Sequence, residues 1–202
     1  MKPTIKGRLH TDEKQMKVGK EDCFDVNTID SKTKFVIEGE FMKSRTSEII
    51  CSYFKRIKDK VYAQILERYQ QEKNKSYKKR KLITFVSDEF DNYRSGAVMH
   101  FYRTCKIVSG VPIACKKYKL EHNNNPIERY NQDIENRYKT TRHWGSFESA
   151  SLTLRMQQII HNFVNPHMEL NGKTPAEAAG IILDLGRNKL LGLIELAYMP
   201  KT

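Results

Sequence analysis

The spacing of apolar residues changes twice along this chain, and that change restricts the possible folds more than any other feature. In the first third, β-branched and aromatic residues fall in short segments typical of strands, at 7–18, 23–29 and 35–37. From Thr46 to Glu72 they recur at steps of three and four, which predicts one long amphipathic helix. The apolar run Leu82–Val86 then predicts a short, buried, central strand.

The rest of the chain alternates between helical and extended patterns. We expect a helix over 91–105, a strand at 106–108, a helix that begins at Pro126, and another helix at 146–164. Thr174–Ala179 is typical of a capped helix start. Strands followed by a helix, a strand, a helix, a strand and further helices indicate a mixed α/β domain.

The charge of the chain indicates its partners. Lys and Arg number 36 against 24 Asp and Glu, a formal net charge of +12, so nucleic acid or an anionic membrane is the expected partner class. The apolar runs are too short to span a bilayer, and the N-terminus lacks the apolar segment of a signal peptide. The four cysteines show no Cys-x-x-Cys pair and no His at zinc-finger spacing, which favours reduced thiols in the cytosol. The basic run 73–81 is interpreted as a solvated linker, with contact to a DNA backbone as the alternative.

Two aspartates are placed where strands end. Asp88 follows the run Leu82–Val86, and functional side chains of α/β sheets gather beyond the carboxyl ends of strands. The alternative role for Asp88 is a turn or an N-cap for the next helix. Asp12 lies near the end of the first strand, with Glu13 beside it. Asp30 is a rival to Asp12, but it lies in a hairpin turn, where an aspartate has an ordinary structural role.

Glu128 is the third candidate acid, and it has a competing explanation. Asn125–Glu128 has the form of a capping box, in which the glutamate caps its own helix, as Thr174–Glu177 also does. Glu128 nevertheless lies on a polar side of its helix, opposite an apolar side. We expect that polar side to face a catalytic groove, with the nearby cations holding phosphates: Arg129, Arg137, Lys139 and Arg142.

In this order, the residues resemble the D-D-E transposases of bacterial and archaeal insertion sequences, which belong to the retroviral-integrase and RNase H-like superfamily. The resemblance covers roughly residues 7 to 182 and includes Asp12-Glu13, Ser87-Asp88, Asn124–Arg129, Asn162–His167 and Gly172–Gly180. The interval between the second and third acids, 128 − 88 = 40, also suits the family. We therefore expect a catalytic domain at 1–182 and a C-terminal extension at 183–202.

The resemblance implies an RNase H-like α/β fold, with a five-stranded mixed sheet flanked by helices. It places the first acid on the first strand, the second after the fourth strand, and the third on a helix. It also implies that Asp12, Asp88 and Glu128 are catalytic and bind two Mg²⁺ or Mn²⁺ ions, with Asp12 as the bridging ligand. Carboxylates suit these hard cations, and two of them can assist both the attacking and the leaving oxygen of a phosphodiester.

The chain departs from the family's pattern in three places. Leu9 and Lys14 occupy positions where relatives often have Trp and Thr, and Glu89 follows the second acid where Gly is frequent. Relatives usually also carry an N-terminal helix-turn-helix region that recognises the element's ends. We expect this chain to lack that region, because only about a dozen residues precede Asp12.

The leading interpretation is a transposase catalytic domain that performs metal-dependent DNA strand cleavage and strand transfer for an insertion sequence. Its expected partners are double-stranded DNA, as transposon ends and target, and further copies of itself, with no membrane. Its expected location is the cytoplasm of a prokaryote, in association with the nucleoid. Two alternatives stay open. One is a truncated, non-catalytic remnant that binds DNA or regulates a full-length transposase, and the other is an RNase H-like nuclease that does not join strands.

Overall fold

The computed structural model describes residues 2–109, 125–141 and 144–198. Its strands are β1 (Leu9–Val18), β2 (Glu21–Asp30), β3 (Val36–Met42), β4 (Thr84–Val86) and β5 (Lys106–Val108). Its α-helices are α1 (Ser47–Glu72), α2 (Asp91–Phe101), α3 (Asn125–Thr141), α4 (Phe147–Phe163), α5 (Pro175–Ala178) and α6 (Lys189–Tyr198). Two 3₁₀ turns complete the elements, η1 (Tyr77–Lys79) and η2 (Met168–Leu170).

The five strands form one mixed sheet in the order β3-β2-β1-β4-β5. β1, β2 and β3 form an antiparallel meander, whereas β4 pairs in parallel with both β1 and β5. The expected meander, the central strand and the five-stranded mixed sheet are all confirmed. β3 continues to Met42, beyond the expected 35–37. The sequence does not predict this extension, because polar residues interrupt the apolar strand pattern there.

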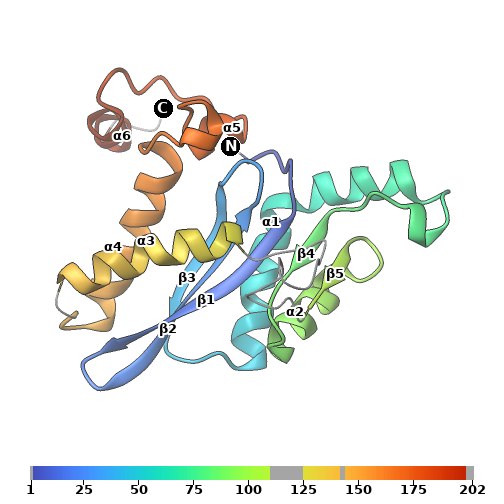
Figure 1. The fold of residues 1–202 in the computed structure, drawn as a ribbon, viewed down its shortest axis with the longest axis horizontal. Helices are drawn as coiled ribbons and strands as arrows, with labels where there is room; N and C mark the ends of the chain where they lie inside the picture. The colour runs from blue at the N-terminus through green and yellow to red at the C-terminus, as the bar shows by residue number, and fades with distance from the viewer. Residues whose placement is uncertain (1, 110–124, 142–143, 199–202) are drawn as a thin grey trace.

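Helices cover both faces of this sheet, and each face has its own core. Figure 1 shows α1 and α2 on one side of the strands and α3 and α4 on the other. One apolar cluster joins the sheet to α1 and α2 through residues such as Leu9, Phe54 and Phe85. A second cluster joins it to α3 and α4 through residues such as Ile29 and Ile134. The sheet is therefore buried on both faces, as parallel βαβ connections require.

The segment after α4 returns to the start of the chain. Thr174 and Glu177 form the expected capping box of α5, and the backbone of Thr4 donates to the carbonyl of Ala179 over 2.8 Å. α6 follows in 183–202, a segment for which the sequence analysis assigns no element. No helix in the three described ranges has both the length and the apolarity needed to cross a membrane.

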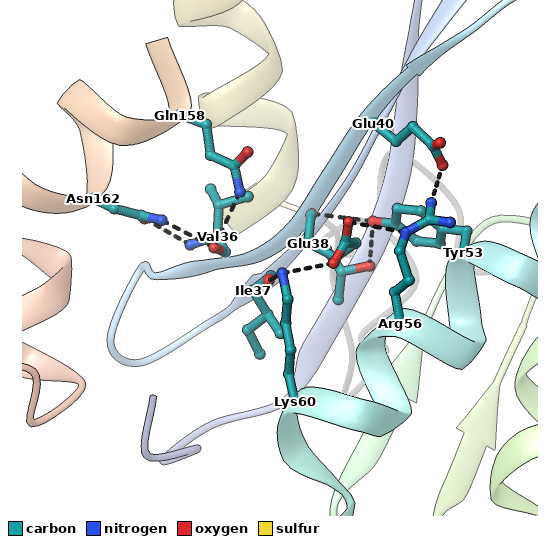
Figure 2. Close-up of polar contacts among 10 residues, drawn as sticks. Val36, Ile37, Glu38, Glu40, Tyr53, Arg56, Lys60, Gln158 and Asn162 are labelled. Atoms are coloured by element: carbon teal, nitrogen blue, oxygen red, sulfur yellow. Dashed lines mark hydrogen bonds and ion pairs between the residues drawn. The ribbon is translucent and has the colours of Figure 1, made fainter. Parts of the chain in front are cut away.

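β3 is an edge strand, and side chains of α4 and α1 bind outer backbone groups of its first residues. The amide of Asn162 accepts from the backbone nitrogen of Val36 over 2.9 Å and donates to its carbonyl oxygen over 3.0 Å. Figure 2 shows Asn162 and Gln158 turned toward Val36, while Lys60 of α1 donates to the carbonyl of Ile37 over 2.8 Å. These bonds cover the first part of an edge that would otherwise be open to pairing with another strand.

The glutamates of β3 complete this arrangement from the side of α1. Glu38 is buried and forms ion pairs with Lys60 over 2.6 Å and with Arg56 over 3.3 Å. Arg56 also pairs with Glu40 (Figure 2). Because the buried carboxylate of Glu38 has two cationic partners, β3 carries this acid without leaving an unpaired charge at the edge of the core.

Replacing Asn162 with Ala should lower the free energy of unfolding by about 2–4 kcal/mol, because the backbone nitrogen of Val36 loses its partner and its carbonyl keeps only the 3.5 Å bond from Gln158. Asn165→Ala is the matched control, since Asn165 is exposed in the same segment and its loss should change stability by less than about 0.5 kcal/mol. Urea denaturation of both variants measures the difference. Equal stability of the two variants would show that Asn162 does not hold the edge.

Candidate metal centre

The parallel pairing of β1 with β4 sets the positions of two of the candidate acids. Leu9 pairs with Phe85 and His10 with Val86. Asp12 and Asp88 are each two residues further along, so they lie level with one another beyond the paired segment. Ligand oxygens of Asp12, Asp88 and also Glu13 all lie within 4.8 Å of one another. Three carboxylates therefore converge on one point.

Asp12 is the most perturbed of these acids. Its side chain is partly buried and accepts a hydrogen bond from Nδ2 of Asn131 in α3 over 3.0 Å. Burial, with smaller contributions from the charges of Glu13, Asp88 and Glu128, raises its pKa to about 7 against one opposing backbone hydrogen bond. The charged form of Asp12 is therefore disfavoured while no cation is bound.

Asp88 is anchored by the turn that follows β4. Its Oδ1 accepts from the backbone nitrogen of Phe90 over 3.1 Å, and its carbonyl accepts from the hydroxyl of Ser109 over 2.9 Å. α2 begins at Asp91 with Phe90 as its N-cap residue, so Asp88 is not the cap of that helix. It does make a local turn bond, and the turn directs its carboxylate toward Asp12.

Glu128 reaches the same region from α3 but stands apart from the three convergent acids. It is half-buried, burial raises its pKa, and its charge contributes to the raised pKa of Asp12. It is not among the residues whose ligand atoms lie within 4.8 Å of one another. The helix begins at Asn125, and the residue before it lies outside the described residues, so the capping explanation for Glu128 stays a prediction.

Asp30, the rival first acid, has a purely structural set of partners. Its carboxylate accepts from the backbone nitrogens of Lys6, Gly7, Lys32 and Thr33. It is also fully buried. These bonds tie the N-terminal segment to the β2–β3 turn, which is the role expected of an aspartate in such a turn.

Three of the four candidate DNA-binding residues, Arg129, Arg137 and Lys139, lie along α3 in different surroundings. Arg129 is exposed and pairs with Glu169, which also pairs with Lys34. Lys139 pairs with Glu135 over 3.0 Å, and Glu135 also binds Lys14 of β1 over 2.7 Å. Arg137 is exposed, and Arg142 lies outside the described residues. Within the described part of α3, Lys139 is thus linked to β1 two residues beyond Asp12, whereas Arg129 is turned toward Glu169.

Two residues of the site were not assigned a role from the sequence. Glu13 was missed because side chains alternate along a strand, so a neighbour of Asp12 is expected on the opposite face. Asn131 lies on the same polar side of the helix as Glu128. Its position one turn after Glu128 is the signal that could have linked it to the acids.

The donor set fits a divalent metal ion such as Mg²⁺ or Mn²⁺. Carboxylate oxygens are the ligands that such hard cations prefer. Asn131 is buried, and while its Nδ2 binds Asp12, its Oδ1 has no hydrogen-bond partner. An unsatisfied amide oxygen beside carboxylates of raised pKa is suited to a bound cation or its water shell.

No protein-family model and no curated protein matches the sequence. Among solved structures, a chain of the simian T-cell lymphotropic virus intasome in complex with PP2A regulatory subunit B56 gamma is similar, with a TM-score of 0.54 and 10% identity. That match covers 89% of this chain and 58% of the viral chain. The HTLV-2 integrase catalytic core domain in complex with magnesium (trimeric form) is similar with a TM-score of 0.50 and 15% identity, over 89% of this chain and 99% of the core domain.

The chain has the RNase H-like fold of an integrase catalytic core. The fold expected from the sequence is thereby confirmed. In this fold Asp12 lies on the first strand, Asp88 after the fourth, and Glu128 on a helix, as the resemblance implies.

Asp12→Asn should stabilise the metal-free protein by roughly 1–3 kcal/mol at pH 8, and by little at pH 4. The pKa of Asp12 in the folded protein, about 7, exceeds its ordinary value of 3.8. Protonated Asp12 therefore stabilises the fold fully below pH 3.8, and this stability is lost as the pH rises through 7. Chemical denaturation across this pH range in EDTA measures the effect.

Asp25→Asn is the matched control, because complete burial raises the pKa of Asp25 to about 7 as well. Both variants should gain stability at pH 8, but only Asp12→Asn should lose the rise in melting temperature that Mg²⁺ produces. An Asp12→Asn protein no more stable than the parent at pH 8 would mean that the cluster is neutralised without a cation.

Proposed function

We propose that this chain is the catalytic domain of a DDE-type transposase, which cleaves and joins DNA strands with the help of Mg²⁺ or Mn²⁺. One observation carries the proposal: Asp12 and Asp88 lie level beyond two paired parallel strands, with ligand oxygens within 4.8 Å, in a chain of net charge +12. A carboxylate cluster in a basic protein suits a cation-dependent reaction on a polyanion.

Each residue of the site has a role in this proposal. Asp12, Asp88 and Glu128 would hold the cations, with Asp12 as the shared ligand, as the resemblance implies. Asn131 orients Asp12 through its Nδ2. When bound, the cations would lower the pKa of an attacking water or 3′-hydroxyl and stabilise the charge on the leaving oxygen.

The DNA backbone would be held by cations along the helix that carries Glu128. We assign Arg129, Arg137 and Lys139 of α3 to this role, together with Arg142, which follows them in the sequence. Arg129 and Lys139 are held by Glu169 and Glu135, and a phosphate would compete with these exposed ion pairs, which contribute little stability. Such contacts give affinity without reading sequence.

The proposed setting follows from the same resemblance. The substrates would be the ends of an insertion sequence and a double-stranded target, inside a prokaryotic cell and in association with its nucleoid. Self-association is part of the proposal, and the HTLV-2 integrase core, which is described in a trimeric form, has the same fold.

One observation favours a second candidate, a non-catalytic transposase remnant that binds DNA or regulates a full-length enzyme. Glu128 does not join the three acids whose oxygens lie within 4.8 Å. If Glu128 does not reach the metal ions when DNA is present, the chain would bind DNA and metal without cleaving or joining DNA strands.

Incubation with supercoiled plasmid and a labelled oligonucleotide carrying a free 3′-hydroxyl, in Mg²⁺ or Mn²⁺, tests these functions. We expect joined, labelled product from the parent chain. Asp12→Asn, Asp88→Asn and Glu128→Gln should reduce it to the level seen in EDTA, since each removes a charged ligand. Glu89→Gln, which removes an exposed acid next to Asp88, should leave joining intact.

The products separate the candidates. Nicking without joining would indicate a nuclease, and DNA binding without either reaction would indicate a remnant. Joining that persists in Asp12→Asn and Asp88→Asn would contradict the assignment of the site.

A further inference from the structure

Glu13 belongs to the acidic cluster even though it follows Asp12 directly in β1. Asp12 is bound by Asn131 of α3, whereas Glu13 is bound by Tyr93 of α2, so the two side chains leave the strand toward helices on opposite faces of the sheet. A ligand oxygen of Glu13 still lies within 4.8 Å of those of Asp12 and Asp88. The cluster therefore receives the carboxylate of Glu13 from the side of α2. Glu128 approaches the cluster from the opposite side, that of α3.

Both oxygens of Glu13 are fixed by residues from other elements. The hydroxyl of Tyr93 donates to Oε2, and the guanidinium of Arg45 forms an ion pair with Oε1. Tyr93 is fully buried, and only 13% of the Glu13 side chain is exposed. The carboxylate is thus held in one place before any ligand arrives.

Arg45 is itself held in a rigid setting. Its guanidinium lies between two aromatic rings, 4.1 Å from the ring centre of Phe24 and 4.5 Å from that of Phe90. The amide of Asn92 donates to its carbonyl over 2.8 Å. Phe90 is two residues after Asp88, so the residues that hold Glu13 also pack against the turn that carries Asp88.

A simple counter-ion role for Glu13 does not account for its surroundings. Arg45 and Tyr93 already supply partners for both of its oxygens, yet an oxygen of Glu13 still lies within 4.8 Å of ligand oxygens of Asp12 and Asp88. A glutamate placed only to pair with Arg45 would be expected farther from two other carboxylates, because like charges held close together cost free energy.

We propose that Glu13 is a fourth metal-binding carboxylate, and that Arg45 and Tyr93 are the positioning residues that hold it toward the cluster. This inference rests on the proposed metal-dependent function, and adds a ligand that the D-D-E pattern does not contain. Fixing the carboxylate in advance removes the cost of ordering a flexible side chain when the cation binds.

Equilibrium binding of Mn²⁺, followed by the electron paramagnetic resonance signal of the free ion, tests this without reference to activity. Glu13→Gln should weaken Mn²⁺ binding by about 10-fold or more. Glu89→Gln is the control, because it removes a nearby negative charge that lies outside the cluster, and should change affinity by less than about twofold. Equal affinities of the two variants would overturn the proposal.

Tyr93→Phe tests the positioning role with the ion pair between Arg45 and Glu13 intact. We expect the Mn²⁺ affinity of Tyr93→Phe to fall several-fold, and an unfolding curve in EDTA shows whether the variant is folded. An unchanged Mn²⁺ affinity would overturn the positioning role of Tyr93. Glu13→Gln leaves Arg45 without its ion pair, so the folding of Glu13→Gln is also checked by unfolding in EDTA. If Glu13→Gln is unstable, Tyr93→Phe still provides the test.

Asp12→Asn separates this inference from the proposed function. If Asp12→Asn abolishes Mn²⁺ binding and Glu13→Gln does not weaken it, only the role of Glu13 is wrong. If Asp12→Asn binds Mn²⁺ as well as the parent does, the metal centre and the role of Glu13 are both wrong.

Discussion

The parallel pairing of β1 with β4 is the interaction on which the rest of the site depends. It joins two segments separated in the sequence by β2, β3 and the long helix α1, and it fixes their register at Leu9 with Phe85 and His10 with Val86. A shift of one residue would turn every side chain of the strand to the other face. Asp12 and Asp88 would then no longer lie level, so the register that buries Leu9 and Phe85 in the core also assembles the acids.

Burial of these acids opposes the stability that the core supplies. The apolar clusters on the two faces of the sheet hold the strands together, while Asp12 and Glu13 are kept in a setting that raises their pKa. Surrounding elements hold the acids in place, through Asn131 on one face and Tyr93 on the other. A site built in this way is less stable empty than filled, because a bound cation removes the repulsion.

Much of the fold could be predicted because its elements carry strong local patterns. The helix from Ser47 to Glu72 has apolar residues at helical spacing throughout, and β4 is a short apolar run between polar flanks. The second half of β3 could not be predicted, because Glu38 and Glu40 are neutralised by Arg56 and Lys60 of α1, and those contacts exist only in the folded chain.

The site divides in the same way. Asp12 could be preferred to Asp30 because turn chemistry explains Asp30 locally, and the four backbone donors on its carboxylate agree with that. Glu13 could not be found, because strand alternation argues against it and only the placement of Tyr93 and Arg45 brings its carboxylate back to the cluster. The packing of α2 and α3 against β1 decides which polar residues meet, and such long-range packing leaves no local pattern.

The most direct test of the central claim is a crystal structure of the protein grown with Mn²⁺, with anomalous scattering recorded to locate the ion. The account predicts an anomalous peak between the carboxylates of Asp12 and Asp88, with Glu13 in contact on the α2 side. An empty cluster, with Mn²⁺ bound elsewhere or not at all at saturating concentration above pH 7, would contradict it.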